Sequence, residues 1–218
     1  MTNSLHTVLF DLDGTLADTA PDLASALNKV RAEEGLPPLP YETIRTEVSH
    51  GSVAITRIGF DMDKDHPEFE RLRKRLLEIY EANLCVETRL FPGMDKVLEK
   101  IESSGMNWGV VTNKPGWLTD PLLEQMGLSE RAACIISGDT TNNRKPHPEP
   151  LLEACKLAGS EAAQCLYVGD AIRDIEAGKN AGMQTLVALF GYIGEQDKPE
   201  TWGADGMIHS PEELMQWI

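Results

Sequence analysis

The sequence predicts an α/β fold: a Rossmann-like, doubly wound parallel sheet with an inserted, all-helical cap domain. Short apolar runs recur along the chain, helical patterns separate the later runs, and a long helical stretch follows the first run. Strands and helices in alternation are typical of open parallel sheets with helices on both faces. At 218 residues, the chain is long enough to bury a hydrophobic core of this kind.

The predicted strands are short runs that are apolar throughout. Continuous apolar character without alternation is typical of parallel strands that are covered on both faces of a sheet. These runs are residues 7–10, 108–111, 133–136, 165–168 and 185–189. Between the later runs, apolar residues in the segment 94–101 recur at helical spacing, and the segment 148–159 begins with Pro and ends with Gly. We therefore expect helices between these strands.

The first interval between strands is much longer than the others. It extends from Phe10 to Trp108, whereas a βαβ unit needs only about 30 residues. Its sequence is helical in character, with one apolar helix face formed by Phe69, Leu72, Leu76, Ile79 and Tyr80. We expect residues 17–88 to form a helical cap domain over the carboxyl edge of the sheet, where open α/β folds bind ligands. Residues 1–16 and 89–218 then form the α/β core domain.

The composition argues against several classes of protein. The formal net charge is -15 and no stripe of Lys and Arg is visible, so a nucleic-acid partner is not expected. No apolar run approaches the roughly 20 residues of a membrane span, and the N-terminal sequence lacks the features of a signal peptide. We therefore expect no membrane partner and a cytoplasmic location. The cysteines lack zinc-site spacing and are expected to be reduced.

Polar side chains follow four of the predicted strands. The carboxyl ends of parallel strands lie at one edge of a sheet, so we expect these side chains to meet there and form an active site. Each of them alone has a common structural explanation, such as a capped turn or a solvated charge. The residues are Asp11, Asp13, Thr112, Asn113, Lys145, Asp170 and Asp174.

The carboxylates of this group predict a bound metal ion, because carboxylates brought together repel one another and a cation relieves that repulsion. Oxygen donors without His or Cys select a hard ion, and few carboxylates combined with a substrate phosphate are typical of Mg2+. Lys145 adds a positive charge for a phosphate or for a nucleophile. The Thr112 hydroxyl and the backbone N–H groups at Gly14 and Asn113 can line an anion site. We count Thr112 and Lys145 as candidate catalytic residues, and Asn113 and Lys145 as candidate substrate-binding residues.

The motifs DLDGT, VVTN, KP and GDAIRD occur in this order, with the helical insertion after the first. On these motifs the sequence resembles the haloacid dehalogenase superfamily of phosphohydrolases over nearly its full length, and the phosphoglycolate phosphatase-like branch within it. The stretches VVTNKP, GDAIRDIEAGKNAGM and GYIGEQDKPETWGAD resemble the bacterial N-acetylmuramic acid 6-phosphate phosphatases of cell-wall recycling. One departure is Ala171, where the family commonly has Ser. We expect altered hydrogen bonding there without loss of the metal.

The resemblance implies a Mg2+-dependent phosphomonoesterase that forms an aspartyl-phosphate intermediate. Asp11 is the implied nucleophile, and Asp13 is the implied general acid and base. Mg2+ would be held by the Asp11 carboxylate, the backbone carbonyl of Asp13 and Asp170. Asp174 either binds the ion directly or orients Lys145 or a metal-bound water.

The cap is expected to select the substrate, a small phosphorylated metabolite. The resemblance makes 2-phosphoglycolate and N-acetylmuramic acid 6-phosphate the two candidates. The polar turn SHGSVAI between cap helices could reach a substrate, so His50 and Arg57 are candidate substrate-binding residues. A helix N-cap at Ser49 or Ser52 is the favoured interpretation of the turn itself. The oligomeric state, monomer or homodimer, stays open.

Functions of other classes also stay open. A sugar-phosphate mutase of the β-phosphoglucomutase type shares the fold, the cap and the nucleophile. Such enzymes often carry basic residues shortly after the first motif, and here the first basic residue after it is Lys29. A non-catalytic phosphate-binding protein would not need both Asp11 and Asp13. A dehalogenase is disfavoured, because those enzymes work without Mg2+ and lack the second Asp.

Overall fold

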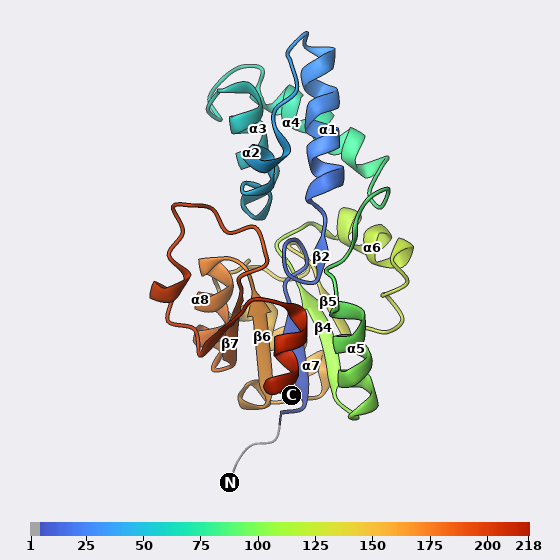
Figure 1. Ribbon diagram of the computed structural model, residues 1–218, viewed down its shortest axis with the longest axis vertical. Helices are drawn as coiled ribbons and strands as arrows, with labels where there is room; N and C mark the ends of the chain where they lie inside the picture. The colour runs from blue at the N-terminus through green and yellow to red at the C-terminus, as the bar shows by residue number, and fades with distance from the viewer. Residues whose placement is uncertain (1–4) are drawn as a thin grey trace.

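The computed structural model describes residues 5–218 and contains the α/β fold that the sequence predicts. A sheet of six strands has the order β5-β4-β1-β6-β7-β8, and every neighbouring pair is parallel (Figure 1). The strands are β1 Thr7–Phe10, β4 Asn107–Val111, β5 Cys134–Ile136, β6 Cys165–Gly169, β7 Gln184–Ala188 and β8 Gly206–Ile208. The predicted Rossmann-like architecture is confirmed.

Strand β1 lies inside the sheet, between β4 and β6, and is buried along its whole length. Phe10 is paired with Val110 of β4 and with Val168 of β6, so the three strands end close to one another. The pairing extends one step further, because the backbone N–H of Asp11 donates to the carbonyl of Val168 at 2.9 Å. The residues that follow these strands are therefore neighbours at the carboxyl edge of the sheet.

Helices cover both faces of the sheet. Helix α5 and the 3-10 helix η4 pack in the cluster that contains Val8 and Phe10, whereas α7 and α8 pack in the cluster that contains Leu9. Alternate side chains of β1 thus enter opposite cores, which explains why the consecutive residues Val8, Leu9 and Phe10 are all apolar. The bounds are α5 Met94–Ser103, α6 Gly116–Gln125, α7 Glu149–Ala158, α8 Ile172–Ala181 and η4 Pro211–Gln216.

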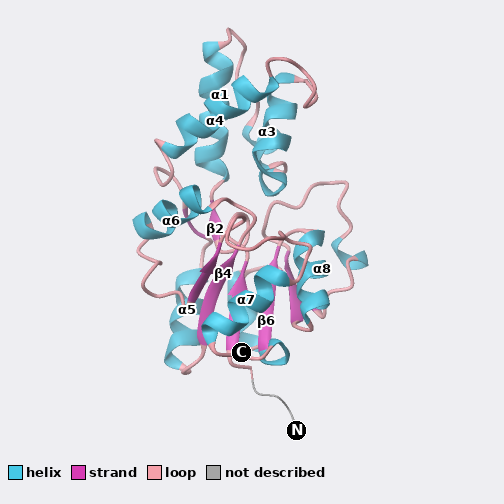
Figure 2. Cartoon of the chain, turned by 180° about the vertical axis from the view of Figure 1, so that it is seen from behind, coloured by secondary structure: helices cyan, strands magenta, loops and turns pink. Residues whose placement is uncertain are grey.

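A second group of helices lies beyond the carboxyl ends of the strands, at the top of Figures 1 and 2. These helices are α1 Ala20–Glu33, α2 Tyr41–Arg45, η1 Val48–His50, α3 Gly51–Phe60 and α4 Phe69–Glu81. We call residues 20–81 the cap. The apolar face that the sequence predicts on α4 is buried: Phe69, Leu72, Leu76, Ile79 and Tyr80.

The chain enters and leaves the cap through a small antiparallel pair of strands, β2 Ala17–Asp18 and β3 Arg89–Leu90. The buried carboxylate of Asp22, at the start of α1, accepts hydrogen bonds of 2.9 to 3.0 Å from the backbone N–H groups of Glu87 and Thr88. These bonds tie the outgoing chain to the incoming one. The predicted boundaries lie at the first residues of β2 and β3, although the division into two domains stays a prediction.

Several short elements were not expected from the sequence. The strands β2, β3 and β8 are additional, and the observed ends of the predicted strands differ from the expected ends by about one residue. All four cysteines are free thiols. Within residues 5–218, no helix combines the length and the apolar character needed to cross a membrane.

Candidate active site

Asp11 stands directly at the end of β1 and is buried. Its Oδ1 accepts a hydrogen bond from the backbone N–H of Leu12 at 2.7 Å and lies 2.9 Å from the Nζ of Lys145. The apolar strand thus brings a carboxylate into a nearly dry environment with a cation beside it. Burial raises the pKa of Asp11 to about 6, although the Lys145 ammonium opposes the rise.

Lys145 is fully buried and is the positive centre of this group. Besides Asp11, its Nζ lies 2.7 Å from Oδ1 of Asp174 and donates to the Tyr167 hydroxyl at 2.8 Å. The side-chain amide of Asn113 makes two hydrogen bonds to the backbone of Lys145. Its Nδ2 donates to the Lys145 carbonyl at 3.0 Å, and its Oδ1 accepts from the Lys145 N–H at 3.1 Å. The Asn113 side chain is therefore engaged in positioning Lys145.

Asp170 follows β6 and has two unequal carboxylate oxygens. Oδ2 accepts hydrogen bonds from the Ser49 hydroxyl at 2.7 Å and from the backbone N–H of Tyr192 at 2.8 Å. Oδ1 is buried and has no hydrogen-bond partner. Such an oxygen is costly to bury unless something outside the chain engages it. Burial, followed by the charges of Asp11 and Asp174, raises the pKa of Asp170 to about 7.

Asp174 lies in the first turn of α8 and is buried. Its Oδ2 accepts a hydrogen bond from the backbone N–H of Ala171 at 3.1 Å. Ala171 is the position where the family commonly has Ser, and its main chain still binds the Asp174 carboxylate. Burial alone would raise the pKa of Asp174. The nearby cations Lys145 and Arg173 outweigh burial, so the pKa lies below its ordinary value. Asp174 is thus the carboxylate that stays ionised without outside help.

Asp11, Asp170 and Asp174 form a compact acidic cluster. Each offers one carboxylate oxygen, these oxygens lie within 4.8 Å of one another, and all three residues are buried. One cation, Lys145, touches two of them and leaves Oδ1 of Asp170 unpartnered. Oxygen-only donors with one unsatisfied carboxylate oxygen are suited to a hard divalent ion.

The backbone at Gly14 approaches this cluster closely. Gly14 has a φ of +84°, in the left-handed region that favours glycine. A Cβ added there would overlap the Asp170 carboxylate. The glycine of the first motif is therefore required by both backbone conformation and space.

Asp13 lies apart from the acidic cluster. Its Oδ1 accepts from the Thr19 hydroxyl at 2.6 Å and from the Nζ of Lys114 at 2.8 Å. Lys114 also donates to the Tyr80 hydroxyl of helix α4 at 2.9 Å. The two carboxylates of the first motif thus have different cations, Lys145 for Asp11 and Lys114 for Asp13.

A cavity of about 640 Å³ opens between the core and the cap. Of the residues predicted from the sequence, it is lined by Asp11, Asp13, His50, Thr112 and Asn113. The Thr112 hydroxyl oxygen accepts a hydrogen bond from the backbone N–H of Lys114 at 3.1 Å, which fixes the turn after β4.

Arg57 is not among the residues that line this cavity. Its guanidinium pairs with Asp63 at 2.7 Å, and its side chain is 56% exposed. The structure therefore does not bring Arg57 to the other predicted site residues. Basic side chains that do line the cavity are Arg73, Lys114, Arg144 and Arg173.

The turn that contains Ser49 differs from its favoured interpretation. Helix α3 begins after His50 without a side-chain cap, so neither Ser49 nor Ser52 is its N-cap. Ser49 instead donates to Asp170 at 2.7 Å, and the Ser49 carbonyl accepts from Arg173 at 2.6 Å. These two bonds join the cap to the acidic cluster, because Asp170 and Arg173 belong to the core.

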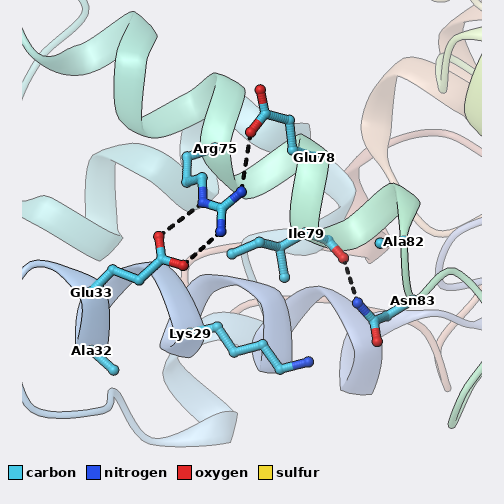
Figure 3. Close-up of a pocket in the computed structure, with 8 residues that line it drawn as sticks. All are labelled: Lys29, Ala32, Glu33, Arg75, Glu78, Ile79, Ala82 and Asn83. Atoms are coloured by element: carbon cyan, nitrogen blue, oxygen red, sulfur yellow. Dashed lines mark hydrogen bonds and ion pairs between the residues drawn. The ribbon is translucent and has the colours of Figure 1, made fainter.

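A second hollow, of about 560 Å³, lies on the cap between α1 and α4 and shares no lining residue with the first (Figure 3). Arg75 is one of its lining residues and pairs with Glu33 at 2.7 Å and with Glu78 at 3.2 Å. All three side chains are more than two-fifths exposed, as in ordinary surface ion pairs. Its lining offers no buried acidic cluster comparable to that of the cavity.

Comparisons with known proteins agree with this geometry. The model of the haloacid dehalogenase-like hydrolase family matches residues 8–188. The chain is 44% identical to an N-acetylmuramic acid 6-phosphate phosphatase of Pseudomonas putida over 98% of this chain and 96% of that protein. It is also 44% identical to a phosphoglycolate phosphatase of Xanthomonas campestris, over 96% and 94% of the two chains.

A solved structure gives the same result for the fold. A predicted phosphoglycolate phosphatase from Haemophilus somnus superimposes with a TM-score of 0.86 at 27% identity, covering 98% of this chain and 97% of that one. The family model covers both the first motif and the acidic cluster, and the relatives match over nearly the whole chain. The chain therefore belongs to the haloacid dehalogenase-like hydrolases.

Proposed function

We propose that the chain is a Mg2+-dependent phosphomonoesterase that works through a covalent phosphoryl group on Asp11. The observation that carries this proposal is the unpartnered, buried Oδ1 of Asp170 beside Asp11 and Asp174. The three buried carboxylates outnumber the two cations near them, Lys145 and Arg173, and leave negative charge that a divalent ion would balance. The phosphatase names of the relatives support the same reaction class.

The residues that would hold Mg2+ are the Asp11 carboxylate, Oδ1 of Asp170 and the backbone carbonyl of Asp13. When bound, Mg2+ would neutralise negative charge shared by the Asp11 carboxylate and the substrate phosphate. Asp174, which already pairs with Lys145 at 2.7 Å, is suited to orienting Lys145. Lys145 in turn opposes the rise that burial causes in the pKa of Asp11, and so favours the ionised form that a nucleophilic carboxylate requires.

In the first step a carboxylate oxygen of Asp11 forms a bond to phosphorus, and the bond from phosphorus to the ester oxygen breaks. Asp13, which must enter this step as the carboxylic acid, gives its proton to the departing alkoxide. In the second step Asp13 takes a proton from water, whose oxygen attacks the same phosphorus. The bond between phosphorus and Asp11 breaks and inorganic phosphate leaves, so that Asp11 is again a carboxylate and Asp13 again a carboxylic acid.

The substrate is a small phosphorylated metabolite, either N-acetylmuramic acid 6-phosphate or 2-phosphoglycolate. Relatives with each name are equally similar to this chain at 44% identity. The cavity of about 640 Å³ is of a size that accommodates drug-sized ligands, which supports the bulkier sugar phosphate. Trp117 and the apolar side chains of Val48 and Leu77 line it and could pack against a sugar.

Phosphate release from the two esters, measured side by side at matched Mg2+, tests the proposal. We expect release that requires Mg2+, is lost in Asp11→Asn and is faster with N-acetylmuramic acid 6-phosphate. Isomerisation of glucose 1-phosphate without phosphate release would support the mutase instead. If no phosphomonoester, p-nitrophenyl phosphate included, were hydrolysed in the presence of Mg2+, the chain would be a non-catalytic phosphate-binding protein.

A further inference from the structure

Lys114 is a buried cation to which the proposed chemistry assigns no task. It stands just after the turn that follows β4, and its side chain is only 6% exposed. Its Nζ lies 2.8 Å from Oδ1 of Asp13 and 4.7 Å from the centroid of the Tyr80 ring. A buried charged side chain of this kind is retained at a cost unless its partners need it.

The partner of this ammonium is the carboxyl group proposed to transfer protons. Oδ1 of Asp13 accepts from both Lys114, at 2.8 Å, and the Thr19 hydroxyl, at 2.6 Å. Across residues 5–218, no hydrogen bond or ion pair engages the other oxygen, Oδ2. Two donors on one oxygen fix the rotation of the carboxyl group and leave the second oxygen available to a substrate.

Lys114 also connects this carboxyl group to the cap. Its Nζ donates to the Tyr80 hydroxyl at 2.9 Å, and Tyr80 lies on the buried face of α4. Tyr80 and Lys114 both line the cavity, as Asp13 does. A continuous path of hydrogen bonds thus runs from a cap helix through Lys114 to Asp13.

We propose that Lys114 is a positioning residue that holds Asp13 with one oxygen free for proton transfer, and that Tyr80 makes this arrangement depend on the seated cap. The inference rests on the proposed phosphomonoesterase function and adds a residue to it. Lys114 acts through Asp13, whereas Lys145 acts on Asp11 and the acidic cluster. The cap therefore contributes to proton transfer as well as to substrate selection.

If Lys114 positions Asp13, the loss of rate caused by removing Lys114 should depend on the leaving group of the ester. An alkoxide is a poor leaving group and needs a proton as it departs, whereas p-nitrophenolate is stable without one. Correct placement of a general acid contributes typically 10²- to 10⁴-fold to a reaction that needs it. Loss of Lys114 should therefore slow alkyl phosphates far more than p-nitrophenyl phosphate.

The test compares kcat for N-acetylmuramic acid 6-phosphate and p-nitrophenyl phosphate in wild type, Lys114→Met and Tyr80→Phe, with Lys29→Met as the matched control. Lys29 lines the separate cap hollow of Figure 3, so its variant should leave both rates unchanged. For Lys114→Met we expect a fall of about 100-fold on the sugar phosphate and under about tenfold on the aryl ester. Tyr80→Phe should shift the ratio in the same direction by a smaller factor.

Equal losses on the two esters in Lys114→Met would overturn the inference and leave the phosphatase assignment intact. If Lys114→Met does not fold, as judged by circular dichroism, Tyr80→Phe decides, because it keeps the buried ring and removes only the hydroxyl. An unchanged ratio in Tyr80→Phe would then refute the link to the cap. A wild-type protein that releases phosphate from neither ester refutes the proposed function, and the inference with it.

Discussion

Neutralising Asp170 or Asp174 in the metal-free protein should change its stability in opposite directions. Burial and the charge of Asp11 raise the pKa of Asp170 from 3.8 to about 7. The folded-state pKa of Asp170 lies above its unfolded-state value. The ionisation of Asp170 therefore does not affect the free energy of unfolding below pH 3.8, and it lowers that free energy increasingly as the pH rises to about 7. The pKa of Asp174 is lowered, so its contribution is present above pH 3.8 and is lost as pH falls through its folded-state pKa.

The size of the effect follows from the displacement of the Asp170 pKa. At about 1.4 kcal/mol per pKa unit, a rise from 3.8 to about 7 corresponds to roughly 4 kcal/mol at pH 8. Asparagine keeps an oxygen that can accept from the Ser49 hydroxyl and the Tyr192 N–H. Asp170→Asn should therefore stabilise the metal-free protein by up to this amount at pH 8, and by much less at pH 5. Asp174→Asn should destabilise it by about 3 kcal/mol, because Lys145 loses a buried partner.

Urea unfolding in EDTA at pH 5 and pH 8 measures both variants against wild type. With Mg2+ in place of EDTA, wild type should gain stability and Asp170→Asn should not, since Oδ1 of Asp170 is the proposed ligand atom. A metal-free Asp170→Asn protein that is less stable than wild type at pH 8 would refute the reasoning. So would changes of the same sign in the two variants.

Three further outcomes are expected. Saturating Mg2+ should raise the unfolding temperature more at pH 8 than at pH 5, because at pH 5 the ion must displace protons from the acidic cluster. Thermal unfolding scans at both pH values measure this difference. Gly14→Ala should lower stability by several kcal/mol and weaken Mg2+ binding in titration calorimetry, since its Cβ would overlap Asp170. Arg57→Ala should leave kcat/KM within about twofold of wild type, whereas Arg73→Ala, which alters the cavity wall, should raise KM about tenfold.

The central strands could be predicted from the sequence because each is buried on both faces and is therefore apolar throughout. That pattern identified β1, β4, β5, β6 and β7 to within about one residue at each end. Strand β8 has no such pattern: it is three residues long, and Met207 in its middle is 44% exposed. The pair β2 and β3 is shorter still, with two residues in each strand, and its pairing depends on where the cap returns to the core.

The meeting of Asp11, Lys145, Asp170 and Asp174 could be predicted because each follows a parallel strand, and strand ends share an edge. The contacts between the cap and the core could not be predicted from the sequence. Ser49 reaches Asp170 only because of the way the cap sits on the core, which no local pattern encodes. A signal for Lys114 was present in the VVTNK stretch, directly after Asn113.

The most direct test of the central claim is to identify the atom that carries the phosphoryl group during turnover. Wild type and Asp13→Asn, which should break the intermediate down slowly, are mixed with Mg2+ and p-nitrophenyl phosphate, quenched, reduced with borohydride and digested for mass spectrometry. We expect the aspartate at position 11 to be converted to homoserine, with more conversion in Asp13→Asn than in wild type. Modification of a different carboxylate, with Asp11 unaltered in an enzyme that is turning over, would contradict the assignment of Asp11 as the nucleophile.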